Sequence, residues 1–489
     1  MQEAYNFNNV QGYRTGFLNN NLYVLNAGAP DGQAATGGAS ALNLRSYFGR
    51  VNYVFDSKYL VEANMRYDGS SRFSPENRWG TFPSFSLGWR ISEEEFFKGL
   101  ASTFSELKLR GGWGMLGNQN TTSNYYPAIY TISPGYNYPL GGSLSPGVTV
   151  ANSANENIKW ESTTSWNIGA DVSFAKTSLD ISFDYFVRNT SDILLQLPVP
   201  ITFGLPAPFQ NAGNVKNNGI ELQVHKRGIV NKFKYSASLV GSYIVNKITN
   251  WKELDPQPYS SYYFYNTGYP VRAFYGLEAT GIYRSEADLA ANPAKVNGNV
   301  GVGDLIYKDQ NNDGKIDGKD RVYLGSPDPK YTFGVNLGGE YKGFDIQIFL
   351  QSAAGVKGYL WGEAVGGISG SEKPTEAFLD RFHPTLNPGG NMPRALTTWT
   401  QNSPSTNPSS FWTIDGSYLR MKNLTVGYNL PSGVVNRLKI KGAKVYYSGQ
   451  NLLTFSKFWD GFDPEAPAAS RGNFYPQVKT NTIGLNVNF

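Results

Sequence analysis

The segment YLVEANMRY at residues 59–67 decides the fold of this chain. Its odd positions, from Tyr59 to Tyr67, are apolar or aromatic, whereas Glu62, Asn64 and Arg66 lie between them. Because successive side chains of a β-strand point to opposite faces, this alternation predicts a strand with one apolar and one polar face. The same alternation recurs in residues 166–174, 179–188, 344–350 and 482–489.

The composition excludes several classes of protein. The chain has 489 residues, of which 15% are aromatic and 17% charged, with 54 Gly and no Cys. Aromatic content this high is not typical of a disordered chain. No apolar run reaches the roughly 18 residues of a transmembrane helix. A chain without Cys has no disulfide, thiol nucleophile or zinc-thiolate site. The net charge of +5 is spread without a block of Lys or Arg, so no nucleic-acid partner is expected.

The connections between the alternating segments separate two architectures. A soluble β-sandwich or propeller also has one apolar and one wet sheet face, so alternation alone does not exclude it. Here, however, very short turns alternate with very long loops, as in a transmembrane β-barrel. The short turns lie near residues 56–58, 175–177, 228–231 and 342–343, and the long loops span about 118–157, 190–216, 284–330, 355–415 and 453–474.

The sequence therefore predicts an all-β, antiparallel transmembrane β-barrel that is partial, with about 15 strands of a larger barrel. Residues 1–42 are expected to form an exterior loop or an incomplete N-terminal segment, and residues 43–489 the C-terminal part of the barrel. The alternation of strand direction requires two barrel strands, at 260–268 and 271–283. Open strand edges are not tolerated in lipid, so residues upstream of Met1 are expected to supply further strands. Short rim helices are predicted near 93–100 and 285–292.

One loop carries a metal-binding pattern. The stretch DQNNDGKIDGKD at 309–320 matches a twelve-residue calcium loop, with Gly314 at its sharp turn. Its position twelve is Asp rather than Glu, and no strong helix flanks it. The alternative is a polar loop without an ion. The sequence predicts a structural Ca²⁺ site that fastens the long 284–330 loop, with ligands Asp309, Asn311, Asp313, the Lys315 carbonyl, Asp317 and Asp320.

Catalytic side chains are scarce, whereas loop aromatics are frequent. The two histidines are His225, on the polar face of a predicted strand, and His383, in a loop. A Ser-His hydrolase site would need one of them beside a nucleophile and an orienting acid, and the chain is not expected to be an enzyme. Tyrosine rings stack on sugars or pack on peptides, although loop packing and an interfacial girdle use them too. The candidate substrate-binding residues are Tyr125, Tyr126, Tyr136, Tyr138, Tyr262 and Tyr263.

A series of motifs in a fixed order carries a family resemblance. They are RYDGSSRF at 66–73, FPSFSLGWR at 82–90, LKLRGGWG at 107–114, NNGIEL at 217–222, the calcium-like loop, GSYLRMKNL at 416–424, GQNL at 449–452 and DPE at 463–465. Together they resemble the C-terminal part of SusC/RagA-type TonB-linked outer-membrane proteins, over nearly the whole chain from about residue 43. No single motif would be specific, but the ordered series is.

The resemblance implies an importer in the outer membrane of a Gram-negative bacterium. Such proteins take up large nutrients, typically oligosaccharides or peptides, beneath a SusD-like surface lipoprotein, with energy from the TonB complex. Coupling to TonB runs through an N-terminal plug, which the motifs do not include. The final strand ending in Phe489 resembles a barrel-assembly signal. Two alternatives stay open: a plug-less structural or adhesive outer-membrane barrel, and a membrane-embedded hydrolase using His225 or His383.

Overall fold

The structure is a computed structural model. It describes residues 2–15, 34–120, 125–134, 136, 138–145, 147–150, 152–197, 199–251, 257–258, 262–360, 376–396, 402–403, 406–459, 462–466 and 477–489.

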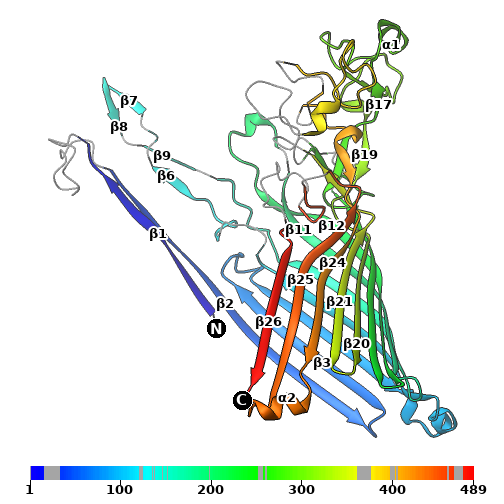
Figure 1. Cartoon of the computed structure of the whole chain (residues 1–489). Helices are drawn as coiled ribbons and strands as arrows, with labels where there is room; N and C mark the ends of the chain where they lie inside the picture. Colours follow the sequence, from blue (N-terminus) through cyan, green and yellow to red (C-terminus); the bar gives the residue numbers. More distant parts are fainter. Residues whose placement is uncertain are drawn as a thin grey trace.

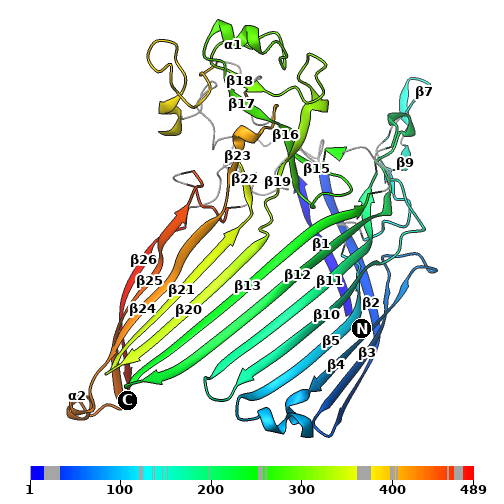
Figure 2. The same cartoon turned by 90° about the vertical axis from the view of Figure 1, so that its right-hand side faces the viewer.

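Fourteen of the described strands form one antiparallel sheet that curves like part of a cylinder wall (Figure 1, Figure 2). The order in the sheet follows the order in the chain, as expected when neighbouring strands are joined by turns or loops. The strands are β1 (Gln2–Tyr13), β2 (Ala34–Phe55), β3 (Tyr59–Ser70), β4 (Trp79–Arg90), β5 (Phe104–Asn118), β10 (Glu161–Phe174), β11 (Leu179–Gln196), β12 (Phe209–Val230), β13 (Phe233–Asn250), β20 (Tyr331–Tyr341), β21 (Phe344–Ala354), β24 (Tyr418–Asn429), β25 (Gly442–Ser456) and β26 (Thr480–Asn488).

The outer face of this sheet is apolar and exposed, which confirms the alternation seen in the sequence. Exposed side chains there include Val61, Ile168, Leu239 and Leu337. Aromatic rings gather at both rims: Tyr67 stacks on Trp79 at 4.7 Å near the long-loop end, and Phe344 lies 4.5 Å from Tyr428 near the short-turn end. An apolar band flanked by two aromatic girdles is the surface of a transmembrane barrel.

The inner face is polar and cross-linked between strands. Arg110 on β5 contacts Asp171 on β10 at 3.1 Å and Asp184 on β11 at 2.5 Å. On the same inner face, toward the C-terminal edge of the sheet, Lys444 on β25 lies 2.7 Å from Asp345 on β21. These pairs satisfy charged groups on the face that lipid does not cover.

Short connections close one end of the sheet. Two are two-residue turns, Asn231 with Lys232 and Lys342 with Gly343, and the β2–β3 turn has three residues, Asp56 to Lys58. Asp56, Ser57, Asn231, Lys232 and Lys342 all have positive φ angles, as the right-handed twist of hairpins requires. The β4–β5 connection carries the short helices η2 (Ile91–Glu93) and η3 (Glu95–Leu100), and the β24–β25 connection carries α2 (Ser432–Arg437). The predicted helix near 93–100 is confirmed. No helix among the described residues is long and apolar enough to cross a membrane.

Long loops at the other end build a separate folded region, which we call the head (residues 257–329 and 356–417 as far as described). It contains a small sheet of β14 (Gln257–Pro258), β15 (Tyr263–Tyr265), β16 (Ala273–Leu277) and β19 (Arg321–Gly325), with β17 (Ala279–Ile282) pairing with β18 (Leu305–Tyr307). Helix α1 (Glu286–Ala291) lies where a helix was predicted, and Ser285 caps it.

The prediction of two barrel strands at 260–268 and 271–283 is wrong. Strands β15, β16 and β17 belong to the head and do not pair with the large sheet. The physical reason is burial: Ala273, Phe274 and Leu277 of β16 are all buried, on both faces of the strand. A barrel strand with a lipid face and a wet face would instead alternate.

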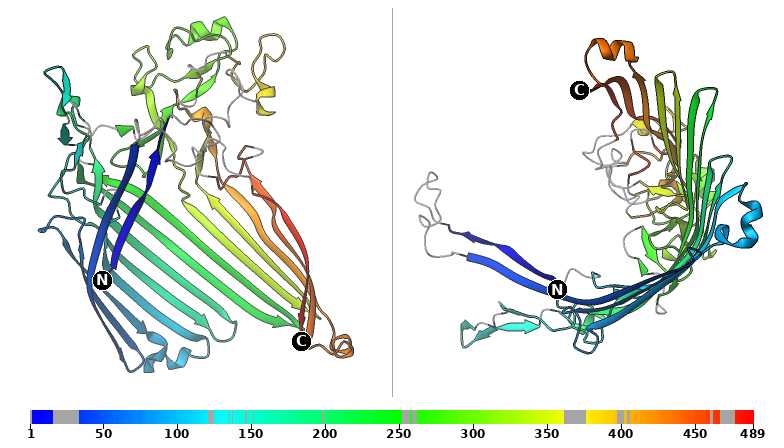
Figure 3. Two further views of the ribbon diagram at one scale, coloured as in Figure 1. Left: turned by 90° about the vertical axis from the view of Figure 1, so that its left-hand side faces the viewer. Right: turned by 90° about the horizontal axis from the view of Figure 1, so that it is seen from below.

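The large sheet is open. Strand β1 pairs with the part of β2 from Ala34 to Leu44, beyond the part that pairs with β3, and the far edge is β26. Seen from below, the sheet is an arc whose two edges do not meet (Figure 3). Within the predicted 1–42 segment, residues 2–13 are therefore a strand rather than a loop. The division at residue 42 stays a prediction.

Candidate ligand-binding surface at the long-loop end

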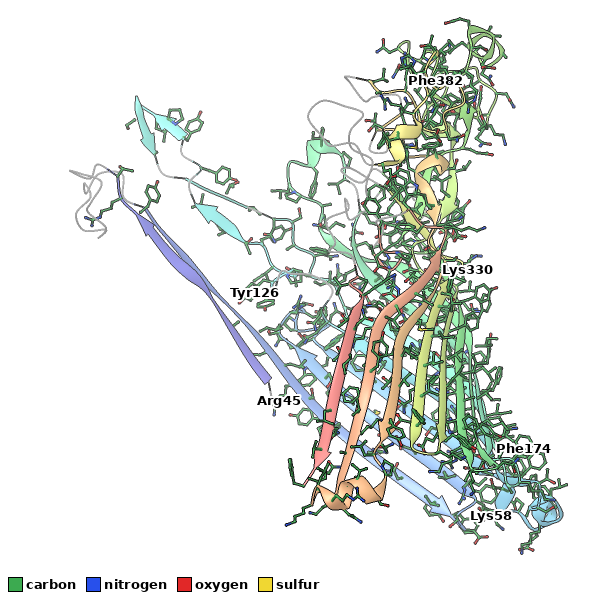
Figure 4. The ribbon with its side chains drawn as sticks, viewed as in Figure 1. Arg45, Lys58, Tyr126, Phe174, Lys330 and Phe382 are labelled. Carbon is green, nitrogen blue, oxygen red and sulfur yellow. The ribbon has the colours of Figure 1, made fainter. Side chains whose placement is uncertain are left out.

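The head has a conventional buried core. Phe274, Tyr359, Phe378 and Trp412 lie in one cluster, at most 3% exposed, and Figure 4 shows the head standing above the end of the strands, with Lys330 at its base and Phe382 near its top. Burial raises the pKa of the Tyr359 hydroxyl, so this group stays neutral at physiological pH. The head thus has its own packed core and stands over one end of the barrel wall.

A buried carboxylate joins three loops of the head. Asp304 is fully buried and accepts hydrogen bonds from Arg394 Nε at 2.9 Å and from Asn402 Nδ2 at 2.8 Å. It also accepts one from the Gly301 backbone N–H at 2.9 Å. The Asn402 carbonyl in turn accepts from Trp412 Nε1 at 3.0 Å. A buried charge with this many donors holds the loops in one arrangement.

A second network ties a loop to the wall. Arg420 on β24 is 2% exposed and lies 2.8 Å from Asp463 and 3.2 Å from Glu465. Glu465 also lies 3.2 Å from Lys422. The GSYLRMKNL and DPE motifs of the family resemblance therefore meet in space, where they fasten the β25–β26 loop to the sheet.

A cavity of about 830 Å³ lies where the head meets the inner face of the sheet. Among its lining residues are Asn217, Ser242, Asn246, Tyr269, Arg272, Tyr323, Asp328 and Thr332. The rings of Tyr269 and Tyr323 lie 5.5 Å apart, and each is 37% exposed. Asn246 donates to Asn217 Oδ1 at 2.7 Å, and the hydroxyls of Ser242 and Thr332 are 2.6 Å apart. Arg272 pairs with Asp328 at the same site.

The chemistry of this cavity suits a polar polymer. Flat rings next to amides and hydroxyls offer stacking surfaces and hydrogen bonds to sugar hydroxyls or to peptide groups. Another cavity of about 560 Å³ at the same end is lined by further amides, those of Asn155, Asn157, Gln210 and Asn211. Neither cavity could be predicted from the sequence, because the residues that line it come from distant segments with no local signature.

The six candidate tyrosines separate into four environments. Tyr262 stacks on Tyr359 at 5.0 Å and Tyr263 stacks on Phe274 at 5.1 Å, so both pack against the head core. Tyr126, labelled in Figure 4, exchanges hydrogen bonds of 3.1 Å with the backbone of Ala41. The remaining three comprise Tyr125, over which the Arg72 guanidinium lies at 5.3 Å, and the exposed Tyr136 and Tyr138. The structure does not bring the six together, and their role stays a prediction.

The calcium-like loop folds tightly around its carboxylates. Asp309 accepts from the Gly314 N–H at 2.9 Å, and its other oxygen is buried with no hydrogen-bond partner among the described residues. Asp313 accepts from the Lys315 N–H at 3.0 Å and from the Asn311 amide at 3.0 Å, and the Asn311 bond lowers the pKa of Asp313.

The last two predicted ligands serve the backbone. Asp317 accepts from the Lys319 N–H at 2.7 Å, and the fully buried Asp320 accepts from the N–H groups of Gln310 and Asp317, both at 2.8 Å. Within the described ranges, no three His, Cys, Asp or Glu side chains are gathered as a metal-holding group. The unpartnered Asp309 oxygen is what fits a cation here, so the calcium site stays a prediction.

The two histidines do not lie in a catalytic arrangement. His225 Nδ1 is 2.7 Å from the Ser238 hydroxyl on the inner face of the sheet. His383 Nδ1 accepts from the backbone N–H groups of Thr385 and Leu386 within its own loop. Neither histidine has a carboxylate partner among the hydrogen bonds of the described residues.

Comparison with known proteins connects this architecture to outer-membrane receptors. Residues 2–452 match the family described as TonB dependent receptor-like, beta-barrel. The chain is 32% identical to "TonB-dependent receptor P3" of Formosa agariphila, over 91% of this chain and 45% of that protein. It is 30% identical to "TonB-dependent receptor SusC" of Bacteroides thetaiotaomicron, over 92% of this chain and 44% of that protein.

Solved structures show the same fold. The chain is similar to a chain in "Structure of the RagAB peptide transporter", with a TM-score of 0.76, 24% identity, and coverage of 97% of this chain and 51% of that one. At this identity the likeness concerns the fold alone. The chain spans about half the length of the relatives that it matches.

Proposed function

The chain belongs to the TonB dependent receptor-like β-barrel family of the Gram-negative outer membrane, and we propose from this premise that it is the C-terminal barrel portion of an importer for large nutrients. The short turns face the periplasm and the head faces the cell exterior. The substrate is held in the cavity between the head and the inner face of the sheet, and no covalent bond of the substrate is changed.

The observation that carries this proposal is the position of the cavity of about 830 Å³. It lies against the inner face of the wall, at the end covered by the head, where a molecule entering the barrel would pass. Its tyrosines, amides and hydroxyls suit oligosaccharides and peptides alike. The name of one relative, "TonB-dependent receptor SusC", supports the same proposal.

An importer of this kind would work with partner proteins. We propose a SusD-like surface lipoprotein above the head, and the TonB complex as the source of energy through a plug region. The open edges at β2 and β26 also support closure by further strands, because unpaired backbone groups are costly in lipid.

The direct test is uptake by cells that depend on the full-length protein. We expect the double substitution of Tyr269 and Tyr323 by Ala to weaken ligand binding at least about tenfold through lost stacking. The matched substitutions by Phe keep the rings and should retain most of the binding. An oligosaccharide panel and a short-peptide panel, used side by side, identify the substrate class. Equal uptake by the Ala and Phe variants would remove the cavity from the transport path.

We propose that Ca²⁺ bound at residues 309–320 fastens the 284–330 loop, with Asp309, Asn311, Asp313, Asp317 and Asp320 and the Lys315 carbonyl as the candidate ligands. The unpartnered oxygen of Asp309 and the ionised Asp313 support it. Chelator should increase proteolysis of the loop, and Asp313→Ala should reproduce that effect without chelator. Unchanged cleavage in both experiments would count against the ion.

The alternatives make different predictions. A plug-less structural or adhesive barrel would take up no nutrient and would have no plug in its full-length sequence. A hydrolase would lose activity when both His225 and His383 are replaced. Their hydrogen bonds to a hydroxyl and to backbone groups give the hydrolase no support.

A further inference from the structure

The short-turn end of the sheet carries its charges unevenly. In the connections β2–β3 and β4–β5, which we call the neutralised rim, cations are paired with carboxylates. Lys58 lies 2.9 Å from Asp56, and Lys98 lies 2.6 Å from Glu95. Arg90 likewise pairs with Glu93 at 2.8 Å.

The connections β12–β13, β20–β21 and β24–β25 differ. They hold a set of exposed cations that we call the basic rim, and within the described part of the chain none of these takes part in an ion pair. The two carboxylates near this set, Glu340 and Asp345, are already paired with Lys234 and Lys444 on the inner face. The basic rim comprises Lys232, Lys342, Arg437, Lys439 and Lys441.

Each of these connections also exposes apolar side chains. Val230 and Phe233, which pair across the β12–β13 turn, are 57% and 43% exposed on the outer face. The Lys342 ammonium lies 5.2 Å from the centre of the Tyr341 ring, which belongs to the outer face. Helix α2 and the residue after it expose Val434 and Leu438. Cations are thus interleaved with hydrocarbon at the lower border of the lipid-facing band.

The backbone conformation at Lys232 and Lys342 does not favour lysine. Lys232 has a φ angle of 72° and Lys342 one of 47°, a left-handed conformation that favours glycine or asparagine in two-residue turns. Both positions nevertheless carry lysine, so these two turns present cations at the end of the sheet.

We propose that the basic rim binds the phosphate-bearing head groups of anionic phospholipids in the periplasmic leaflet. Ammonium groups reach the phosphates while the lysine stems and the rings of Phe233 and Tyr341 lie against the acyl chains. An acidic protein would be attracted by the same charge, but it would not account for hydrocarbon continuous with the outer face. The inference rests on the membrane placement of the sheet and not on import.

The test is native mass spectrometry of the full-length protein in detergent, titrated with phosphatidylglycerol, cardiolipin or zwitterionic phosphatidylethanolamine. Wild type should retain the two anionic lipids in preference to phosphatidylethanolamine. Lys232→Gln with Lys342→Gln should reduce that preference at least about fivefold, because one cation near an anionic surface changes partitioning by about that factor. Replacement of both by Arg should preserve it.

The matched control is Lys98→Gln with Lys234→Gln, which removes two exposed lysines that are each paired with a glutamate. It should keep the lipid preference, and heat-modifiable electrophoretic mobility should show all variants folded. The proposal is overturned if wild type has no preference, or if the control loses as much as the variant. Displacement of the lipid by inorganic phosphate alone, or an acidic periplasmic protein whose binding needs Lys232 and Lys342 while lipid retention does not, would also overturn it.

Discussion

The barrel wall and the head are both built of antiparallel strands, yet the wall exposes its apolar side chains whereas the head buries them. In the wall, Leu239 and its neighbours on the outer face are exposed, and charged groups such as Arg110 meet their partners on the inner face. In the head, Phe274 and Trp412 are completely buried, around a carboxylate that is buried too. The wall is organised for lipid outside and water inside, whereas the head is organised for water outside.

The largest difference between head and wall should appear when the buried charge of the head is removed. Asp304→Ala leaves the Arg394 guanidinium and the Asn402 amide without their acceptor, and should cost the head about 3–5 kcal/mol. Hydrogen exchange should rise in residues 301–305 and 402–412, while the heat-modifiable mobility of the barrel stays unchanged. Loss of the folded barrel as well would show that head and wall are one cooperative unit.

The control for that experiment is an exposed ion pair of the same head. Glu278 lies 3.4 Å from Lys308, and both side chains are about half exposed. Because surface pairs contribute little, Glu278→Ala should cost under about 1 kcal/mol.

Adjacent residues of β13 test the two faces of the wall. Leu239 lies on the outer face, and Val240, paired with Gln223 and Gly334, lies on the inner one. An arginine at a lipid-facing position near mid-membrane costs about 2–4 kcal/mol, so Leu239→Arg should lower the free energy of unfolding in lipid vesicles by that amount. Val240→Arg should have a much smaller effect, and equal costs would contradict the assignment of faces.

The smallest expected effect concerns the short-turn end. Glu94 accepts hydrogen bonds from Tyr59 at 2.6 Å and from Trp89 at 3.0 Å, and the Tyr59 bond is the main reason that the pKa of Glu94 is lowered. A carboxyl whose folded pKa is lowered stabilises the fold above its ordinary pKa, and this stabilisation is lost as pH falls through the lowered value. The protection factors of residues 91–103, which correct for the intrinsic pH dependence of amide exchange, should therefore fall in acid, and Glu94→Gln should remove that fall. A pH response that survives in Glu94→Gln would assign it to another group.

The same comparison explains what sequence could predict. Period-two alternation in residues such as Leu179, Ile181 and Phe183, taken together with the contrast between short turns and long loops, identifies a wall strand, because one face meets lipid and the other water. Alternation does not identify the head strands, since β16 is buried on both faces and its sequence is an uninterrupted apolar run. Parity of strand direction then placed it wrongly in the wall.

The candidate site was still less accessible to sequence. The Asp304–Arg394 contact joins residues 90 positions apart, and the cavity joins Asn217 to Thr332. No local pattern encodes such meetings, because loop closure and tertiary packing decide them. The calcium-like pattern could be recognised because all of its candidate ligands lie within one twelve-residue stretch, but spacing alone does not tell a bound ion from backbone hydrogen bonds.

We infer that the large sheet spans the membrane and that its polar face lines the route of the substrate beneath the head. The described chain has no Cys, so single cysteines at residues 237–243 of β13 can be labelled one at a time in full-length protein free of other cysteines. In lipid vesicles, we expect quenching of the attached fluorophore by spin-labelled lipid at odd positions, and reaction with a membrane-impermeant maleimide at even ones. Uniform behaviour along the strand, or the opposite phase, would contradict the claim.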